Sequence, residues 1–396
     1  MNNLFRAFVE STKASRWKRN IQLTRIDRVN GLFDLRDTVA QGTYSIDKYT
    51  QFFLHDNGKI RLIRTLPPYD NTVQRALYDN VLIPTITPKL IYNNGASLKG
   101  KGLSFAMNNF YSDLISCKTK YDYHSMYVAF IDFSKFFDNI SHDQLLKSFA
   151  KIFQTDTQDL ISTIINSFGH NVDHLNCQEI SEFDNRPFDP LKDSSQYALS
   201  HKSPTIINMK KIKNKLNRGV VIGAVISQII GVWFPNKIDH YCQTVRQCRY
   251  YGRYMDDIYI IDGDKEKLLS VVNGIQEIAK QLGIFINQSK CRIIRLNQKF
   301  TFLKTTYKIT DRKIYRFAQP CVFDKARAKI KANVEAVKHG IKTIDQIRNE
   351  FLAWKGSVLS KYDARRKVYE VGKIFDNTIQ ELQKWMNSKT LKQTRG

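Results

Sequence analysis

The sequence lacks the features of a membrane-spanning or disulfide-bonded protein. Its longest apolar run, from Val220 to Phe234, is shorter than the ~20 residues that a membrane span needs, and the polar pair Ser227-Gln228 interrupts it. The start of the chain is charged and has no unbroken apolar segment of the kind found in a signal peptide. The six cysteines include no C-x-x-C pair and no histidine partners at zinc spacing. We therefore expect reduced thiols, no membrane segment and a cytoplasmic location.

Acidic residues are scarce relative to basic ones. There are 37 Asp and Glu against 62 Lys and Arg, which gives a formal net charge of +25. The bases are scattered through apolar segments and are not collected in a tail. This favours a polyanionic partner, with nucleic acid ahead of a membrane surface, and charge that serves only solubility is the alternative. With 396 residues and 42% hydrophobic content, the chain can form two or three globular domains.

The first half of the chain contains several clear signals for secondary structure. Two alternating runs flank Asp56-Asn57-Gly58, which predicts a β-hairpin because Asn-Gly readily adopts the positive φ angles of a tight turn. The run 126–133 predicts a buried strand. Ser141 to Gln144 form a capping box that begins a helix over 143–153. A long polar stretch, 172–218, is interpreted as a loop or insertion.

The second half predicts a small sheet with helices. Residues 219–243 are apolar all round and indicate a buried helix entered through a glycine-containing loop. Residues 248–263 predict two strands joined at Met255-Asp256-Asp257, and 265–282 predict a helix that ends at Gly283. Further strands are expected within 284–287, 291–296 and 299–309, and basic helices from about 322 onward. This order suits an antiparallel sheet with helices on one face, an α+β, ferredoxin-like arrangement.

Three carboxylates are expected to converge at one edge of this sheet. Asp132 ends the first predicted strand, and Asp256 and Asp257 lie at the hairpin tip in "RYMDDIYII". Adjacent acids are ordinary in exposed turns, but both flanks here are strongly β-forming and would bury the strands. Such a cluster needs cations to neutralise it, and oxygen ligands favour Mg²⁺ or Mn²⁺. The sequence therefore predicts a two-metal site suited to nucleotidyl transfer.

Residues 50–310 resemble reverse transcriptases. Five segments occur in the order of the palm motifs of that family: FIDFSKFFDNISHDQL, GVVIGAVISQ, RYMDDIYII, GIFINQSK and FTFLK. Two earlier segments, GKIRLIRTLPPYDNTVQRAL and NNGASLKGKGLSFA, are similar to the fingers blocks of the bacterial lineage with group II intron, retron, diversity-generating and defence-associated enzymes. The resemblance implies a right-hand polymerase with fingers, a ferredoxin-like palm and a helical thumb. The implied boundaries are 1–45 for an N-terminal segment of the fingers, 46–120 for the fingers, 121–310 for the palm and 311–396 for the thumb.

The resemblance also assigns roles to individual residues. It implies that Asp132, Asp256 and Asp257 are catalytic metal ligands, with the backbone carbonyl of Phe133 as a further ligand and Lys290 as a general acid. The implied nucleotide-binding residues are Lys59, Arg61, Phe133, Phe137, Ile222, Gly223 and Gln228. The implied template- and primer-binding residues are Gly219, Ser227, Tyr254, Met255 and Leu303. The Phe137 ring would exclude a ribose 2′-hydroxyl, which implies a preference for deoxynucleotides.

Several of these residues have ordinary alternatives. Phe137 could simply pack in the core beside Phe136, and Lys59 and Arg61 could lie on a solvated strand edge. Small residues at helical spacing, such as those that begin at Gly219, more often indicate tight helix packing. The resemblance is what favours the active-site interpretation.

The implied function is RNA-directed DNA synthesis with two Mg²⁺ ions, Mn²⁺ being possible in their place. The implied partners are dNTPs, an RNA template that a dedicated non-coding RNA could supply, and a DNA or RNA–DNA hybrid product. Similarity to defence-associated enzymes of unknown group implies a role in bacterial anti-phage defence. The alternatives are template-independent or protein-primed synthesis, a diversity-generating retroelement enzyme, an RNA polymerase with a similar palm, and a non-catalytic RNA-binding scaffold. Three uncompensated acids speak against the scaffold, and the oligomeric state stays open.

Overall fold

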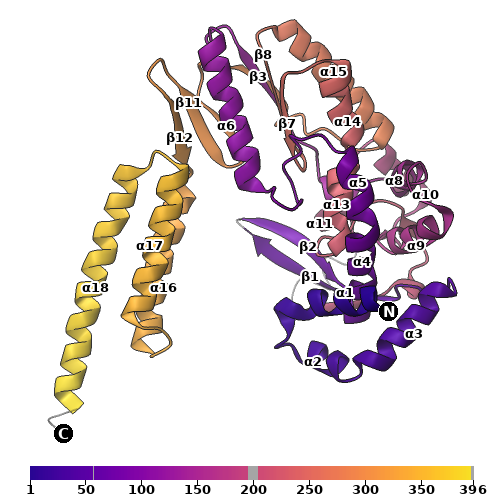
Figure 1. Ribbon diagram of the computed structural model, residues 1–396, viewed down its shortest axis with the longest axis horizontal. Coiled ribbons are helices and arrows are strands. Elements are labelled where there is room, and N and C mark those ends of the chain that lie inside the picture. Colours follow the sequence, from indigo (N-terminus) through magenta and orange to yellow (C-terminus); the bar gives the residue numbers. More distant parts are fainter. Residues whose placement is uncertain (57, 195–203, 394–396) are drawn as a thin grey trace. The chain divides into compact units, whose positions relative to one another are not determined.

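The fold is described from a computed structural model over residues 1–56, 58–194 and 204–393 (Figure 1). The chain forms two compact units. The first comprises Met1–Asp113 and Tyr127–Ile293, and the second comprises Leu114–Met126 and Ile294–Gly396. No helix in the described part of the chain is long and apolar enough to cross a membrane.

Short helices make up much of the first unit. In its N-terminal part they are α1 (Asn2–Thr12), α2 (Arg19–Ile26), α3 (Arg28–Ala40), α4 (Pro68–Leu77), α5 (Ile83–Ile86) and the start of α6 (Leu103–Lys120). Beyond Tyr127 they include α7 (Phe136–Asn139), α8 (His142–Phe149) and α9 (Thr155–Asn166). The Ser141 hydroxyl accepts a hydrogen bond from the Gln144 amide, 3.4 Å away, so Ser141 caps α8 as its sequence predicts. The helix ends at Phe149, four residues earlier than expected.

The predicted hairpin is present as β1 (Lys48–Asp56) and β2 (Lys59–Thr65). The strands pair antiparallel from Thr50 opposite Thr65 to Asp56 opposite Lys59. The turn residue Asn57 lies outside the described residues. A third strand, β5 (Thr205–Asn208), pairs with the other edge of β1. Lys59 and Arg61 are two positions apart in β2, so their side chains lie on the same face of this small sheet.

The central sheet has the strand order β7-β8-β3-β9. Its strands are β7 (Tyr250–Tyr254), β8 (Asp257–Asp262), β3 (Tyr127–Ile131) and β9 (Arg292–Arg295). Helix α15 (Lys265–Leu282) begins at the cap residue Asp264 and ends at Gly283, where φ is +69°. Its apolar side contributes Leu268 and Val271 to one core with Ile258 and Ile260. The predicted hairpin and helix are thus confirmed in this sheet.

Helices cover both faces of this sheet, whereas the sequence predicted one covered face. The Tyr259 ring lies on the face opposite Ile258 and Ile260 because side chains alternate along a strand. The Phe110 ring of α6 packs edge-on against it, with centroids 4.6 Å apart, and the Tyr259 hydroxyl donates to Asp113 at 2.7 Å. The one-face prediction missed α6 because the contact joins residues almost 150 positions apart.

The long apolar stretch 219–243 does not form one helix. Residues up to Ala224 are non-helical, and helix α13 spans Val225–Trp233. Pro235 then serves as the N-cap of α14 (Asn236–His240), and a π-helical turn follows at Tyr241–Val245. A proline inside a helix removes a hydrogen bond and clashes with the preceding turn. The expectation of a continuous helix was therefore wrong at Pro235.

The polar stretch 172–218 is largely folded within its described residues. It contains α10 (Cys177–Ser181), α11 (Pro190–Asp193), β5 and β6 (Lys215–Leu216), which pairs with β4 (His170–Asn171). A separate small core joins Val172, Phe183, Phe188 and Leu216. Part of the stretch, 195–203, lies outside the described residues.

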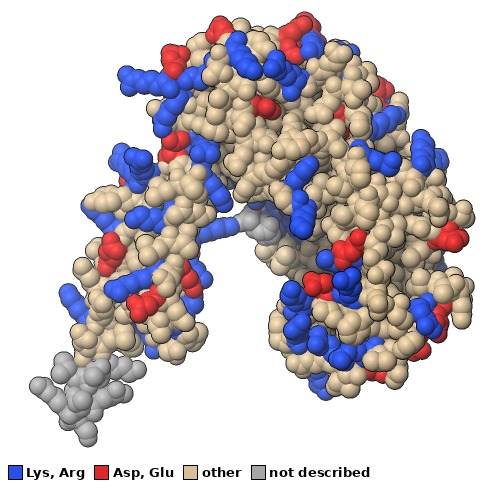
Figure 2. Space-filling model, viewed as in Figure 1, with Lys and Arg blue, Asp and Glu red and all other residues tan. Residues whose placement is uncertain are grey.

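The second unit combines a three-stranded sheet with long helices. The sheet contains β10 (Phe300–Phe302), β11 (Thr305–Ile309) and β12 (Ile314–Ala318). The helices are α16 (Pro320–Lys338), α17 (Ile344–Lys361) and α18 (Arg365–Gln393), which confirms the predicted helical end of the chain. Stacked rings of Phe351 and Phe375, 4.2 Å apart, join α17 to α18. Lys and Arg side chains are spread over these helices on the face drawn in Figure 2.

Candidate active site

Three acidic residues lie where neighbouring strands of the central sheet end. Asp132 directly follows β3, Asp256 is in the two-residue turn after β7, and Asp257 is the first residue of β8. Ile131 pairs with Ile258 across the antiparallel β3–β8 ladder. This register places Asp132 beside the turn that carries Asp256 and Asp257, so the predicted convergence of the three acids has a direct structural cause.

The two acids of the turn are held in an unfavourable environment for negative charge. Burial raises the pKa of Asp256, and the charge of Asp132 adds to that effect. Burial and the charges of Asp256 and Asp132 raise the pKa of Asp257 to about 7. Met255 precedes them with φ of +55°, a left-handed conformation that is uncommon for a residue with a side chain. The turn therefore holds two neighbouring carboxylates whose charges repel each other.

Asp132 has a cationic partner. The Lys290 ammonium lies 2.7 Å from Asp132 Oδ2, and the Asn287 side chain donates to the same oxygen at 3.2 Å. A backbone hydrogen bond from the Asn287 amide to the Asp132 carbonyl, 2.8 Å long, fixes this loop against the end of β3. Lys290 is thus brought into the acidic cluster, whereas the role of Asn287 was not predicted.

The donor atoms of this cluster suit a hard divalent cation. Among the described residues, no three acidic, histidine or cysteine side chains are already arranged as a metal cage, and Asp132 is engaged by Lys290 instead. Three carboxylates and the neighbouring Phe133 carbonyl nevertheless offer oxygen ligands only, which is the ligand set of Mg²⁺. A cation would also relieve the repulsion that raises the pKa of Asp257. The residues therefore fit a divalent metal.

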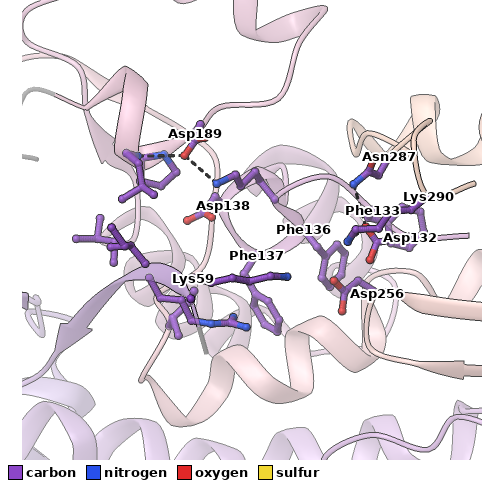
Figure 3. A pocket seen from close by; sticks show the side chains of 18 residues that line it. Lys59, Asp132, Phe133, Phe136, Phe137, Asp138, Asp189, Asp256, Asn287 and Lys290 are labelled. Atoms are coloured by element: carbon purple, nitrogen blue, oxygen red, sulfur yellow. Dashed lines mark hydrogen bonds and ion pairs between the residues drawn. The ribbon is translucent and has the colours of Figure 1, made fainter. Parts of the chain in front are cut away.

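Asp132 and Asp256 line a cavity of about 570 Å³. Figure 3 shows Asp132, Asp256 and Lys290 grouped on one side of it, with Asp138 and Asp189 on another. The cavity is lined by residues of β2, of the loops after β3 and α15, of α7, and of the folded segment that follows α10. Charged residues on its wall are Lys59, Arg61, Asp132, Lys135, Asp138, Asp189, Asp256 and Lys290. Cationic and anionic side chains thus line a space large enough for a nucleotide.

Phe137 separates this cavity from a neighbouring one. Its ring packs edge-on against Phe136, with centroids 5.3 Å apart, and rests on Gly231, where an added Cβ would lie 3.0 Å from the ring. The second cavity is lined by Arg61, Phe137, Ile222, Gly223, Ser227, Gln228 and Met255, among others. The predicted nucleotide-binding residues are therefore brought together around Phe137.

Local steric constraints explain why glycine occupies positions 219 and 223. Gly223 has φ of +116°, and a Cβ there would lie 3.0 Å from the Arg64 carbonyl oxygen. Gly219 has φ of +88°, and a Cβ would lie 2.4 Å from the His170 ring. Gly219 is buried in these contacts. Its predicted approach to the template stays a prediction.

The remaining predicted residues are more dispersed. Ser227 lines the second cavity but is only 2% exposed. Tyr254 is partly buried and pairs with Asp257 across the β7–β8 turn. Leu303 belongs to the second unit, in the two-residue turn between β10 and β11, where its φ is +45°. These placements leave their roles toward template and primer as predictions.

Sequence reasoning missed a buried ionic network behind the acidic turn. Arg253 and Asp239 are both fully buried and form a bidentate pair, with N–O distances of 2.7 and 2.6 Å. The Tyr251 hydroxyl also donates to Asp239 at 2.6 Å. Arg253 Nη1 donates to the Met255 carbonyl at 3.0 Å, which ties the network to the acidic turn. The one sequence feature that could have indicated this network is that Arg253 and Asp239 are charged residues inside apolar segments.

Comparison with known proteins gives the family. The family model described as reverse transcriptase (RNA-dependent DNA polymerase) matches residues 47–307. The chain belongs to the reverse transcriptase family. This confirms the predicted family and its α+β, right-hand polymerase fold.

Two solved structures of telomerases are similar to this reverse transcriptase. One is telomerase from Candida albicans in complex with a fragment of telomeric RNA, with 12% identity, a TM-score of 0.41, and coverage of 86% of this chain and 59% of that one. The other is apo telomerase from Candida tropicalis, truncated from its C-terminal domain, with 14% identity, a TM-score of 0.41, and coverage of 68% and 54%. The chain thus spans little more than half of either telomerase chain. No curated protein matches it.

Proposed function

We propose that this protein is an RNA-directed DNA polymerase whose active site is the cavity that contains Asp132 and Asp256. The family membership supports polymerase chemistry. The observation that carries the proposal is that Asp132 and Asp256, with Asp257 next to Asp256 in the chain, lie at a cavity that Lys59 and Arg61 also line. Nucleotidyl transfer needs oxygen ligands for metal beside cations that hold a triphosphate.

In this proposal, residues from different parts of the cavity wall have different roles. Lys59 and Arg61 bind the triphosphate of an incoming dNTP through charge-assisted hydrogen bonds. The Phe137 ring, fixed against Phe136 and Gly231, excludes a nucleotide that carries a 2′-hydroxyl. Lys290, already within 2.7 Å of Asp132, lies close enough to the acids to donate a proton to the pyrophosphate that leaves.

The metal ligands in this proposal are Asp132, Asp256, Asp257 and the carbonyl of Phe133. Two Mg²⁺ ions bound there would activate the primer 3′-hydroxyl and stabilise the leaving group. The acids hold their positions through the protein itself, since the β3–β8 register and the Arg253 bond to Met255 fix the chain around them. Ile222, Gly223 and Gln228 border the nucleotide, and Gly219, Ser227, Tyr254, Met255 and Leu303 are the proposed template and primer contacts.

The finer assignments belong to the same proposal. We assign 1–45 and 46–120 to the fingers, 121–310 to the palm and 311–396 to the thumb, where the basic helices would track template–primer phosphates. Motif resemblance supports a bacterial enzyme of anti-phage defence, and the cysteine pattern supports a cytoplasmic location. A dedicated non-coding RNA is the proposed source of the template. Template-independent or protein-primed synthesis at the same site is the second candidate, because nothing in the cavity itself requires a template.

The test is nucleotide incorporation by the purified protein with Mg²⁺ on a primed RNA template. Labelled dNTPs and NTPs are compared side by side, with Asp256→Ala/Asp257→Ala as the control. We expect deoxynucleotide incorporation that disappears in the control and with EDTA. Incorporation that persists in the control would refute the assignment of the acids, and equal use of NTPs would refute the role of Phe137.

A further inference from the structure

The folded segment after α10 contributes one wall of the active-site cavity. It is fixed to α7, the helix of Phe137, by a reciprocal pair of buried hydrogen bonds. The Asn139 side chain donates to the Phe188 carbonyl at 3.0 Å and accepts from the Phe188 amide at 2.8 Å. The Phe188 ring packs on His170 and Phe183, with centroids 4.4 and 5.1 Å away. Asp189, the next residue, therefore has a fixed place on the cavity wall.

The Asp189 carboxylate is itself held in position. Its Oδ1 accepts a hydrogen bond from the Leu191 amide at 3.1 Å and so caps α11. Its own amide donates to Asp193 Oδ2 at 2.8 Å, and Arg186 binds both oxygens of Asp193 at 3.1 Å. The Asp189 side chain is 18% exposed. This is a built anionic position inside a cavity for which we propose an anionic substrate.

Lys135, which lines the same cavity, forms an ion pair with Asp189. Its ammonium lies 3.0 Å from Asp189 Oδ1, and its side chain is 41% exposed. Lys135 has φ of +46°, a left-handed conformation at the N-cap of α7. It lines the same cavity as Lys59 and Arg61. Lys135 thus adds a cation beside Lys59 and Arg61 in the space where the triphosphate would bind, and Asp189, from the folded segment after α10, engages it.

We propose that Asp189 is a counter-ion that competes with the nucleotide triphosphate for Lys135. The proposal rests on the nucleotide-binding function proposed above. A triphosphate carries several negative charges and offers many acceptor oxygens, whereas Asp189 offers one partly solvated carboxylate. When the triphosphate enters, Lys135 exchanges Asp189 for phosphate oxygens. The folded segment after α10 thereby sets the affinity of the site for triphosphates from outside the acidic cluster.

The experiment measures binding of dATP and of inorganic tripolyphosphate to the full chain, together with KM and kcat for dNTP incorporation. The test variant is Asp189→Asn, which keeps the Oδ1 acceptor that caps α11 while it removes the charge. We expect roughly three- to tenfold tighter binding of both probes and a matching fall in KM, with kcat nearly unchanged. The gain shrinks at high salt, because the pair is partly exposed.

Further variants isolate the pair. Lys135→Ala weakens binding, and in that background Asp189→Asn has little further effect, because its action passes through Lys135. Asp184→Asn is the matched control: Asp184 is in the same segment and is 76% exposed, and its partner is Arg218. Its binding constants should not change. Asp189→Ser, which can also cap a helix, replaces Asp189→Asn if the latter unfolds.

Three results would overturn the inference. They are unchanged binding in Asp189→Asn and Asp189→Ser, an equal gain in Asp184→Asn, or an undiminished gain in the Lys135→Ala background. Failure of the proposed polymerase function has a different signature. In that case the variants change the binding of dATP and tripolyphosphate as expected, but the protein incorporates no dNTP on any template.

Discussion

The buried pair of Arg253 and Asp239 offers a prediction that separates stability from catalysis. Both side chains are 0% exposed, and two short hydrogen bonds join them. Arg253 also donates to the carbonyls of Val232 and Met255, at 2.7 and 3.0 Å. The perturbation is Asp239→Ala, compared with the double variant Arg253→Met/Asp239→Leu.

The expected magnitude follows from burial. Asp239→Ala leaves a fully buried guanidinium without its counter-charge, which costs about 3–5 kcal/mol of folding free energy. That is a large part of the roughly 5–15 kcal/mol that stabilises a typical domain. The double variant removes both charges and fills the space with apolar atoms of similar volume, so it should be more stable than the single variant. It should stay below the wild type, because the buried Tyr251 hydroxyl loses its acceptor. It still loses the bond from Arg253 to the Met255 carbonyl, which positions the acidic turn.

Urea unfolding and dNTP incorporation are measured on all three proteins. We expect a strongly destabilised single variant, and a stable double variant whose incorporation rate falls by up to about 100-fold, since small displacements of catalytic groups have effects of that size. A single variant that loses less than about 1 kcal/mol would refute the burial argument. A fully active double variant would refute the positioning role of Arg253.

Three other predictions follow from the site. Phe137→Ala should lower the preference for dNTPs over NTPs by at least about tenfold, because the ring no longer excludes a 2′-hydroxyl; an unchanged ratio in competition assays would show that Phe137 only packs in the core. Asp257→Asn should abolish incorporation but raise the midpoint of thermal unfolding in EDTA. The reason is that it removes a carboxylate whose pKa is raised to about 7 by burial and by neighbouring acids. Added Mg²⁺ should stabilise the wild type and not the variant, and stabilisation of the variant alone would exclude Asp257 as a metal ligand. Burial also raises the pKa of Asp138 to about 7, so the folded state binds the Asp138 proton more tightly than the unfolded state does. The free energy of unfolding of the wild type should therefore fall as pH rises from about 4 to 7. Asp138→Asn lacks this contribution, so the difference in free energy of unfolding between the two proteins should grow over that range, and a constant difference would show that the pKa of Asp138 is not raised.

Local patterns were sufficient to predict the acidic turn and its helix. Strongly β-forming flanks around Met255 and Asp256 give two strands, and the two-residue turn places Asp256 and Asp257 at the tip. Gly283 ends α15 because its positive φ suits glycine. The meeting of Asp132 with this tip needed one further assumption, the pairing of β3 with β8, which motif order supported.

Contacts between distant segments could not be predicted. The polar segment that contains Asp189 has no strong periodicity, and its fold depends on a small core and on the Asn139–Phe188 hydrogen bonds across 49 positions. Arg253 and Asp239 lie in two apolar segments, and no local pattern pairs them. The break at Pro235 was visible in the sequence, but the strong hydrophobicity of the flanking residues outweighed it in the prediction of one helix.

The activity that we propose for the acidic cavity is the copying of RNA into DNA. The most direct measurement is the sequence of the product made on a primed RNA template of defined sequence with dNTPs and Mg²⁺, with Asp256→Asn as the inactive control. The proposal predicts a DNA product complementary to the template, absent from the control. A product unrelated to the template would contradict RNA-directed synthesis and favour untemplated addition, and a product that also forms in the control would contradict the assignment of the active site.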